Sequence, residues 1–390
     1  MLIERLNNIE EIINLQKKFY EENGMYPLNV SNWTVSNIFH KEMERLFQHN
    51  MTNSPIDYLY SYSIPSEIKN EVLRKLGTNE ASISNKTCTF FPNNSLSIIN
   101  ICNLLQKMQY KKIGILYPAY FSISACLNTF GIKSIPFYII RKQQKYIIPI
   151  EDILSKNLDA LWITSPIYST GVPYDRNNIN IIEKILQSGM QVISDESFCI
   201  KGQELIRTFS EYKNFISIYS PHKSISFNSY KFSVIICDNY YEDFLDQWLD
   251  IFCGNLPQSS IAAINHYLSN NYTVCYQGYQ TFIKYAQSEV ISVLNKFSNI
   301  DFDHITYGNL MTIYVNNIDY EKSQSIDFLM DVISNTYAMY YPGYLNGFAN
   351  SMGFCFRINL ALYNPDFIAS LERLLVYLCQ IGRASCRERV

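Results

Sequence analysis

Two reactive side chains stand where short apolar segments end. Asp195 directly follows the segment 192–194, and Lys223 lies five residues after the segment 215–218. Short apolar segments bounded by polar residues predict buried strands, and the carboxyl ends of parallel strands share one crevice. An amine and a carboxylate in that crevice would suit a single charged cofactor.

A second group of residues could bind an anion. Asn93-Asn94-Ser95 follows the apolar segment 88–91 and precedes an amphipathic stretch, 96–108, that predicts a helix. The start of such a helix presents free backbone N–H groups, so this turn is a candidate site for a phosphate.

Arg357 is a lone arginine inside the apolar segment 354–360. Burying a charge without a partner is costly, so an anion should lie beside it. Two interpretations remain open, namely a bound carboxylate and a structural ion pair with an Asp or Glu of the chain.

The elements that must position these residues alternate in type, which predicts a large α/β domain with a mainly parallel sheet flanked by helices. The helix at 66–77 is expected to begin with Ser66 as its N-cap. Strands are predicted at 88–91, 112–116, 160–164, 192–194, 215–218 and 233–237, and helices at 66–77, 96–108, 121–130, 177–188 and 241–252.

The later part of the chain predicts a smaller α+β domain. Its predicted elements are helices at 259–270, 279–298 and 367–378 and strands at 311–315 and 354–360.

Composition excludes several classes of protein. The 390 residues are 47% apolar and carry a formal net charge of −3, which is typical of a soluble globular chain and gives no basic surplus for nucleic acid. Apolar runs stay far below the ~20 residues that cross a bilayer. The first 23 residues lack the apolar block of an export signal. We therefore expect a cytoplasmic protein that binds neither membrane nor nucleic acid.

The ten cysteines are scattered singly, without a C-x-x-C motif or the spacing to histidines that metal ligands show. Reduced thiols and no bound metal are predicted. The last ten residues, 381–390, read as the translation of a sequencing adapter, so we expect the natural C-terminus to be missing.

A set of motifs makes the chain resemble the class I and II aminotransferases, the fold-type I pyridoxal-phosphate enzymes, over residues 53–371. The motifs, in chain order, are Pro118-Ala119-Tyr120, Ser165-Pro166-Ile167-Tyr168-Ser169-Thr170-Gly171, Ser194-Asp195-Glu196, Ser220-Pro221-His222-Lys223 and Arg357.

The resemblance implies pyridoxal 5'-phosphate as the cofactor. Lys223 would form a Schiff base with the cofactor aldehyde, and Asp195 would pair with the ring nitrogen. Tyr120 would stack on the ring, although an ordinary core tyrosine is the alternative in a chain with 31 tyrosines.

The phosphate donors that the resemblance implies are Asn94, Ser95 and Ser220. Lys231 stands where the family usually carries an arginine that grips the phosphate. Lysine keeps the charge but loses the two-point geometry of a guanidinium.

Two aromatic residues depart from the family pattern. Tyr168 replaces an asparagine that hydrogen-bonds the cofactor's 3-hydroxyl, and Phe198 replaces a tyrosine that reaches the same oxygen. We predict a swap in which Tyr168 supplies the hydroxyl that Phe198 lacks. His222 is expected to pack beside the site rather than in it, because neighbouring strand residues point to opposite faces.

The implied function is transfer of an amino group between an α-amino acid and an α-keto acid, with Arg357 binding the substrate carboxylate as a two-point fork. One alternative is a pyridoxal-phosphate enzyme of specialised amino-acid metabolism, an oxidase, cyclase or eliminase, which the Ser-Pro-His-Lys motif and the Tyr168 loop favour. A catalytically degenerate homologue is the third, and the intact Asp195, Lys223 and Arg357 count against it.

The resemblance also implies a homodimer in which Tyr58, Tyr60 or Tyr62 reaches the partner's site. The expected division of the chain is an N-terminal arm with part of the small domain (1–50), a large cofactor-binding domain (51–255), a small C-terminal domain (256–380) and the adapter-like tail (381–390).

Overall fold

The fold is taken from a computed structural model, which describes residues 2–32, 41, 63–227, 230–305 and 308–387. Tyr58, Tyr60 and Tyr62 lie outside the described residues. No helix in the described ranges is both long and apolar enough to cross a membrane.

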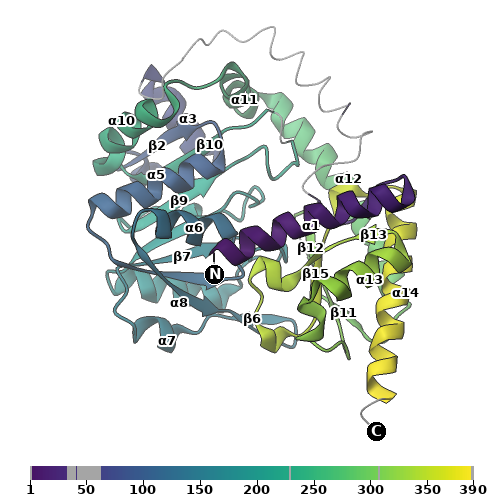
Figure 1. Ribbon diagram of the computed structural model, residues 1–390. Helices are drawn as coiled ribbons and strands as arrows, with labels where there is room; N and C mark the ends of the chain where they lie inside the picture. Colours follow the sequence, from purple (N-terminus) through teal and green to yellow (C-terminus); the bar gives the residue numbers. More distant parts are fainter. Residues whose placement is uncertain (1, 33–40, 42–62, 228–229, 306–307, 388–390) are drawn as a thin grey trace.

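A seven-stranded sheet forms the larger half of the molecule (Figure 1). Only β10 runs antiparallel to its neighbours among these strands, so the predicted mixed, mainly parallel sheet is confirmed. In spatial order the strands are β2 (Lys86–Phe91), β10 (Ser233–Asp238), β9 (Phe215–Tyr219), β8 (Gln191–Asp195), β7 (Ala160–Thr164), β3 (Lys112–Tyr117) and β4 (Lys133–Tyr138).

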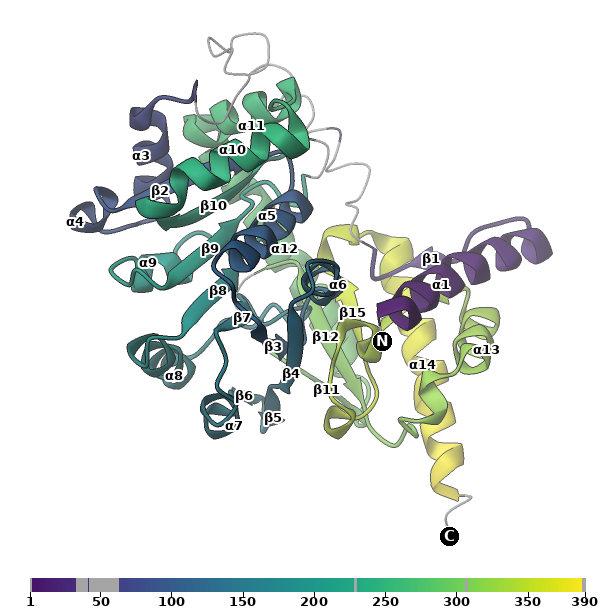
Figure 2. The same ribbon diagram turned by 60° about the vertical axis from the view of Figure 1, so that its left-hand side comes forward.

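Helices cover both faces of this sheet, so its central strands β7, β8 and β9 are buried at every residue rather than at every second one. On β7, Trp162 packs into one core while Leu161 and Ile163 pack into the other. One face carries α5 (Asn94–Lys107), α6 (Phe121–Thr129) and α10 (Glu242–Cys253), and the other carries α3 (Ser66–Lys75), α8 (Arg176–Gln187) and α9 (Leu205–Phe209), as Figure 2 shows.

One local expectation was wrong, and one strand was missed. Helix α3 has Pro65 rather than Ser66 as its N-cap, and no side chain caps it. The strand β4 was not predicted, because it lies at the sheet edge, contains Pro136 and has Phe137 as its one buried residue, so it lacks an apolar pattern.

A four-stranded antiparallel sheet forms the smaller half. Its spatial order is β11 (Ile300–Phe302), β12 (Leu310–Val315), β15 (Cys355–Asn359) and β14 (Tyr341–Pro342). The surrounding elements are α1 (Leu2–Asn23), α12 (Asn270–Leu294), α13 (Ile326–Thr336), α14 (Pro365–Arg387) and the parallel pair β1 (Leu28–Asn29) and β13 (Ala338–Met339). Helix α11 (Gln258–Leu268) packs instead against the large half, where His266 contacts His222 and Tyr267 contacts Tyr219 of β9.

Helix α14 continues past residue 380, where the sequence division placed the end of the small domain. The remaining short elements are α4 (Glu80–Ile83), α7 (Ile150–Leu154), the hairpin β5 (Ile140–Lys142) and β6 (Lys145–Ile147), and 3-10 turns η2 (Asn239–Tyr241), η3 (Lys322–Gln324), η4 (Gly343–Asn346), η5 (Asn350–Met352) and η6 (Leu360–Leu362).

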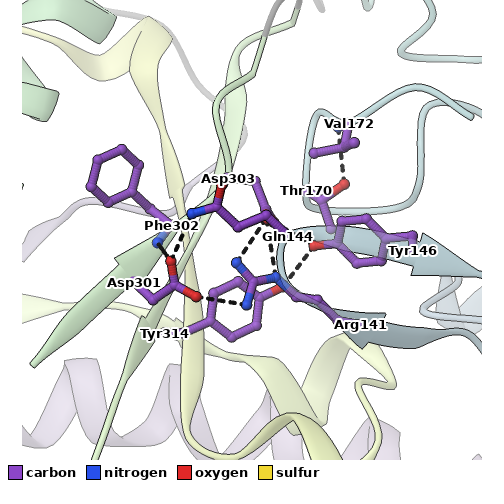
Figure 3. A network of polar contacts seen from close by, with 9 residues as sticks. All are labelled: Arg141, Gln144, Tyr146, Thr170, Val172, Asp301, Phe302, Asp303 and Tyr314. Atoms are coloured by element: carbon purple, nitrogen blue, oxygen red, sulfur yellow. Dashed lines mark hydrogen bonds and ion pairs between the residues drawn. The ribbon is translucent and has the colours of Figure 1, made fainter. Parts of the chain in front are cut away.

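The β5–β6 hairpin is tied to the small sheet by a buried polar network around Arg141 (Figure 3). The guanidinium donates to Asp301 Oδ2 and Asp303 Oδ1, each at 2.8 Å, and lies 4.0 Å from the centre of the Tyr314 ring. The Tyr146 hydroxyl bonds Asp303 and lies 2.8 Å from that of Tyr314. This network holds the β5–β6 hairpin, which follows strand β4 of the large sheet, against the small sheet.

Removing the Arg141 charge should therefore destabilise the protein. Arg141→Met keeps the apolar stem but leaves Asp303, whose side chain is 3% exposed, without its ion pair, so we expect the free energy of unfolding to fall by about 3 kcal/mol. Urea unfolding followed by circular dichroism measures the loss.

The matched control is Lys296→Met, which breaks the exposed pair between Lys296 and Glu372 and should cost less than about 1 kcal/mol. Equal losses in the two variants would contradict a structural role for the Arg141 network.

Candidate active site

A cavity of about 590 Å³ opens at the carboxyl ends of the central parallel strands. Seven of the nine residues predicted for the site line it, which brings together side chains spread over 138 positions. The described lining residues are Asn93, Asn94, Ser95, Tyr120, Thr164, Tyr168, Asp195, Phe198, Lys223 and Lys231.

Lys223 reaches this cavity from a turn rather than from a strand. Strand β9 ends at Tyr219, and the Lys223 amide donates to the Ser220 carbonyl at 3.0 Å. The amine lies 5.1 Å from the centre of the Phe198 ring and 6.0 Å from that of Tyr120.

The surroundings of the Lys223 amine make it a weak base for a lysine. Desolvation lowers its pKa to about 8, the Asp195 carboxylate opposes that change, and the Lys231 charge adds to it. A minor fraction of the amine is consequently unprotonated, and nucleophilic, at neutral pH, and that fraction rises to about half near pH 8.

Asp195 is the last residue of β8, and its carboxylate is held from two sides. Oδ1 accepts from the Ser197 hydroxyl at 2.5 Å and from the Ser197 amide at 3.1 Å, while Oδ2 accepts from Asn94 Nδ2 at 3.3 Å. These bonds fix the direction in which the carboxylate faces the cavity. The Asn94 side chain thus positions Asp195, a contact that the sequence did not predict.

The predicted anion-binding turn lies at the start of α5. Asn93 caps the helix by accepting from the Leu96 amide at 3.1 Å, and Asn94 is the first helical residue. The amides of Asn94 and Ser95 therefore belong to the first turn, whose N–H groups the helix itself does not use. Lys231 adds a cation to the same cavity.

Two predicted site residues are not among the described residues that line the cavity. Ser220 is 1% exposed, and its hydroxyl donates to the Phe232 carbonyl at 3.2 Å. Arg357 is 2% exposed and lies in the middle of β15. Their proposed roles in binding stay predictions.

Arg357 is surrounded by residues that sequence reasoning missed. Its Nη2 donates to the Ser31 carbonyl at 3.0 Å and its Nη1 to Asn346 Oδ1 at 3.4 Å, and the Tyr168 hydroxyl accepts a further hydrogen bond. No local pattern could have indicated Ser31, which lies 326 positions from Arg357, and the Asn346 contact, 11 positions away, depends on how the chain turns between η4 and β15. The contact between Ser197 and Asp195 could have been predicted, because an aspartate side chain often accepts a hydrogen bond from the backbone N–H two residues later.

His222 lies outside the cavity lining, as expected, but for a different reason. It belongs to the turn after β9, where Nε2 lies 3.1 Å from His266 Nδ1, and burial lowers the pKa of His222. The predicted swap of hydroxyls between Tyr168 and Phe198 stays a prediction.

The pKa of Lys223 generates a test. The rate of reductive methylation at Lys223, followed by mass spectrometry, should rise through a midpoint near pH 8, because only the neutral amine reacts. Asp195→Asn should move the midpoint to lower pH and Lys231→Met to higher pH, since the two charges act with opposite sign. Midpoints that shift in the same direction would contradict this assignment.

No family model and no curated protein matches the chain, whereas many solved structures do. The alanine aminotransferase from Pyrococcus furiosus is 16% identical, with a TM-score of 0.75 over 95% of this chain and 97% of that one. The aspartate aminotransferase from Rhizobium meliloti is 12% identical, with a TM-score of 0.76 over 95% of each chain.

A pyridoxal-phosphate-bound C-S lyase from Staphylococcus hominis is also similar, at 16% identity and a TM-score of 0.69 over 90% of each chain. The likeness extends over nine tenths or more of this chain in each case. The chain therefore has the fold of the class I and II aminotransferases that its motifs resemble.

Proposed function

We propose that this chain is a pyridoxal-phosphate-dependent aminotransferase that acts on an α-amino acid and an α-keto acid. The observation that carries the proposal is the Lys223 amine, which shares one cavity with the Asp195 carboxylate and has its pKa lowered to about 8. An amine of that pKa can form a covalent bond to an aldehyde near neutral pH.

The residues of the cavity fit pyridoxal phosphate along its length. Its volume of about 590 Å³ lies within the range of ~300–1,000 Å³ that is usual for small-ligand sites. Lys223 would bond the aldehyde, Asp195 would face the ring nitrogen, and Tyr120 would lie against the ring. The first turn of α5, with Lys231, would hold the phosphate.

Bound there, the cofactor would supply a ring that stabilises negative charge developing at the substrate α-carbon. The chain's own residues would move the proton and bind the substrate. Lys223 Nζ would take the α-proton and return it, which a group with a pKa near the working pH does efficiently. Arg357 would bind the substrate carboxylate and so orient the α-carbon.

A second candidate reaction is elimination, because the similar C-S lyase shows that this fold serves more than one reaction. An oxidase or cyclase of specialised amino-acid metabolism is a further variant, and a degenerate homologue without turnover is the remaining alternative. We also propose that the chain forms a homodimer and that it is located in the cytoplasm.

An absorbance titration with pyridoxal 5'-phosphate tests the proposal. Wild type should develop the band of a lysine-linked cofactor, and Lys223→Ala should not. Lys107→Ala, which removes an exposed lysine on α5, is the matched control and should behave as wild type. A band of equal size in Lys223→Ala would exclude Lys223 as the linking residue.

A panel of amino acids then separates the reactions. Transamination yields one keto acid per enzyme until a second keto acid is supplied, without free ammonia. Elimination releases ammonia in many turnovers, and an oxidase consumes oxygen. Cofactor binding without any product from the panel would favour the degenerate homologue.

The assignment of Lys231 to the phosphate predicts a selective loss of affinity. Lys231→Met should weaken binding of pyridoxal 5'-phosphate by roughly 10- to 100-fold, because a charge-assisted hydrogen bond contributes about 1.5–3 kcal/mol. Binding of pyridoxal, which lacks the phosphate, should be nearly unchanged. Equal losses for both ligands in equilibrium dialysis would show that Lys231 acts elsewhere.

A further inference from the structure

The turn that carries Lys223 contains a residue in an uncommon backbone conformation. Ser226 has a φ of 56°, in the left-handed region that residues other than glycine rarely adopt. Its amide donates to the Lys223 carbonyl at 3.0 Å, which links the conformation of Ser226 to the placement of the lysine. A backbone in this region persists where surrounding contacts hold it, and such residues cluster at functional sites.

Two buried side chains hold Ser226 from outside the turn. The Tyr279 hydroxyl of α12 lies 2.5 Å from Ser226 Oγ, and Asn309 Nδ2 donates to the same oxygen at 3.1 Å. All three residues are buried, so these hydrogen bonds form away from water, where they are stronger.

Asn309 continues this contact to the small sheet. Its Nδ2 also donates to Asn359 Oδ1 at 2.9 Å, and its carbonyl accepts from the Leu360 amide at 2.7 Å. An amide nitrogen carries two protons, so the two side-chain bonds use both and fix the orientation of the group. Asn359 is the last residue of β15, two positions after Arg357. Asn309 therefore joins the turn of Lys223 to the strand of Arg357.

The strand is the fixed end of this connection. β15 is hydrogen-bonded to β12 on one side and to β14 on the other. The Lys223 turn lies outside the strands of the large sheet, because β9 ends at Tyr219. Loss of the Asn309 side chain should consequently loosen the turn rather than the strand.

We propose that Asn309 is a positioning residue, which holds the Lys223 turn through Ser226 and so fixes the amine relative to the strand of Arg357. This inference rests on the proposed function, in which the amine moves the α-proton of a substrate that Arg357 binds. Proton transfer needs the two groups within hydrogen-bond reach, so a small displacement of the turn would slow it.

The first measurement is the rate of reductive methylation at Lys223 against pH, on the full chain after hydroxylamine has released any bound aldehyde. Burial is the largest cause of the lowered pKa of Lys223, so a loosened turn should admit water and raise that pKa. Asn309→Ala should move the midpoint upward from about pH 8 by roughly one unit. An unchanged or lower midpoint would overturn the inference.

Ser226→Gly tests the route of the effect. Glycine adopts a positive φ readily, so this change removes the side chain without straining the backbone. The midpoint should rise here too, and adding Asn309→Ala should move it no further, because the acceptor through which Asn309 acts is already gone. Shifts that simply add would show that the two residues act separately, against the proposed link.

Asn178→Ala is the matched control. Asn178 has the same exposure as Asn309, 3%, and donates two side-chain hydrogen bonds, to the Tyr146 carbonyl and to Asp175 Oδ1, each at 2.8 Å. Its loss should lower stability but leave the Lys223 midpoint at the wild-type value. An equal shift in this control would mean that lost stability, and not lost position, moves the midpoint.

Thermal unfolding measures the stability of each variant. If Asn309→Ala does not fold, Asn309→Ser replaces it, because a hydroxyl has one proton and cannot donate to both Ser226 and Asn359.

Exchange of the substrate α-proton for deuterium separates this inference from the proposed function. It is followed by proton NMR with pyridoxal 5'-phosphate and the panel of amino acids. Asn309→Ala should slow the exchange at saturating amino acid by about tenfold, with little change in the half-saturating concentration. Exchange at the wild-type rate would refute the role of Asn309 alone. If wild type never exchanges the α-proton but the midpoint shifts, the proposed enzyme fails while the positioning of the amine stands.

Discussion

Exclusion of water from the Lys223 amine is the constraint on which the rest of the site depends. Burial makes the charged form of the amine less favourable, which lowers its pKa, and the nearby Asp195 carboxylate raises that pKa in part. Their proximity requires β8 and β9 to run parallel, with their carboxyl ends at one edge of the sheet. Both strands are buried throughout, so the helices on the two faces are a condition for the chemistry as well as for stability.

The second buried cation is accommodated in the opposite way. Around Arg357, the described acceptors from Ser31, Asn346 and Tyr168 are neutral oxygens. They lower the free-energy cost of burying the guanidinium without cancelling its charge. Burial lowers the pKa of both groups, but the guanidinium begins from a higher ordinary value and keeps its charge near neutral pH, whereas the amine can lose its proton.

The parts of this structure that could be predicted are those that depend on the order of apolar and polar residues within short segments. Strand β7 occupies the predicted range 160–164, because a buried parallel strand reads as a continuous apolar run. Lys223 and Asp195 could be identified because reactive side chains followed such runs. The Ser31 contact could not be predicted, since it joins residues 326 positions apart, and the Asn346 contact could not, since it depends on how the chain turns between η4 and β15.

The contact between Ser31 and Arg357 also sets an order of events on the ribosome. It joins residues 326 positions apart, whereas the last strand of the large sheet is complete at Asp238. At ~5–20 residues per second, Arg357 is synthesised roughly ten seconds after that strand. The strands that carry the Lys223 cavity can thus fold before Arg357 exists, and Ser31 gains its contact with Arg357 only later. The carboxylate binding that we propose for Arg357 therefore depends on residues that are synthesised after those that line the Lys223 cavity.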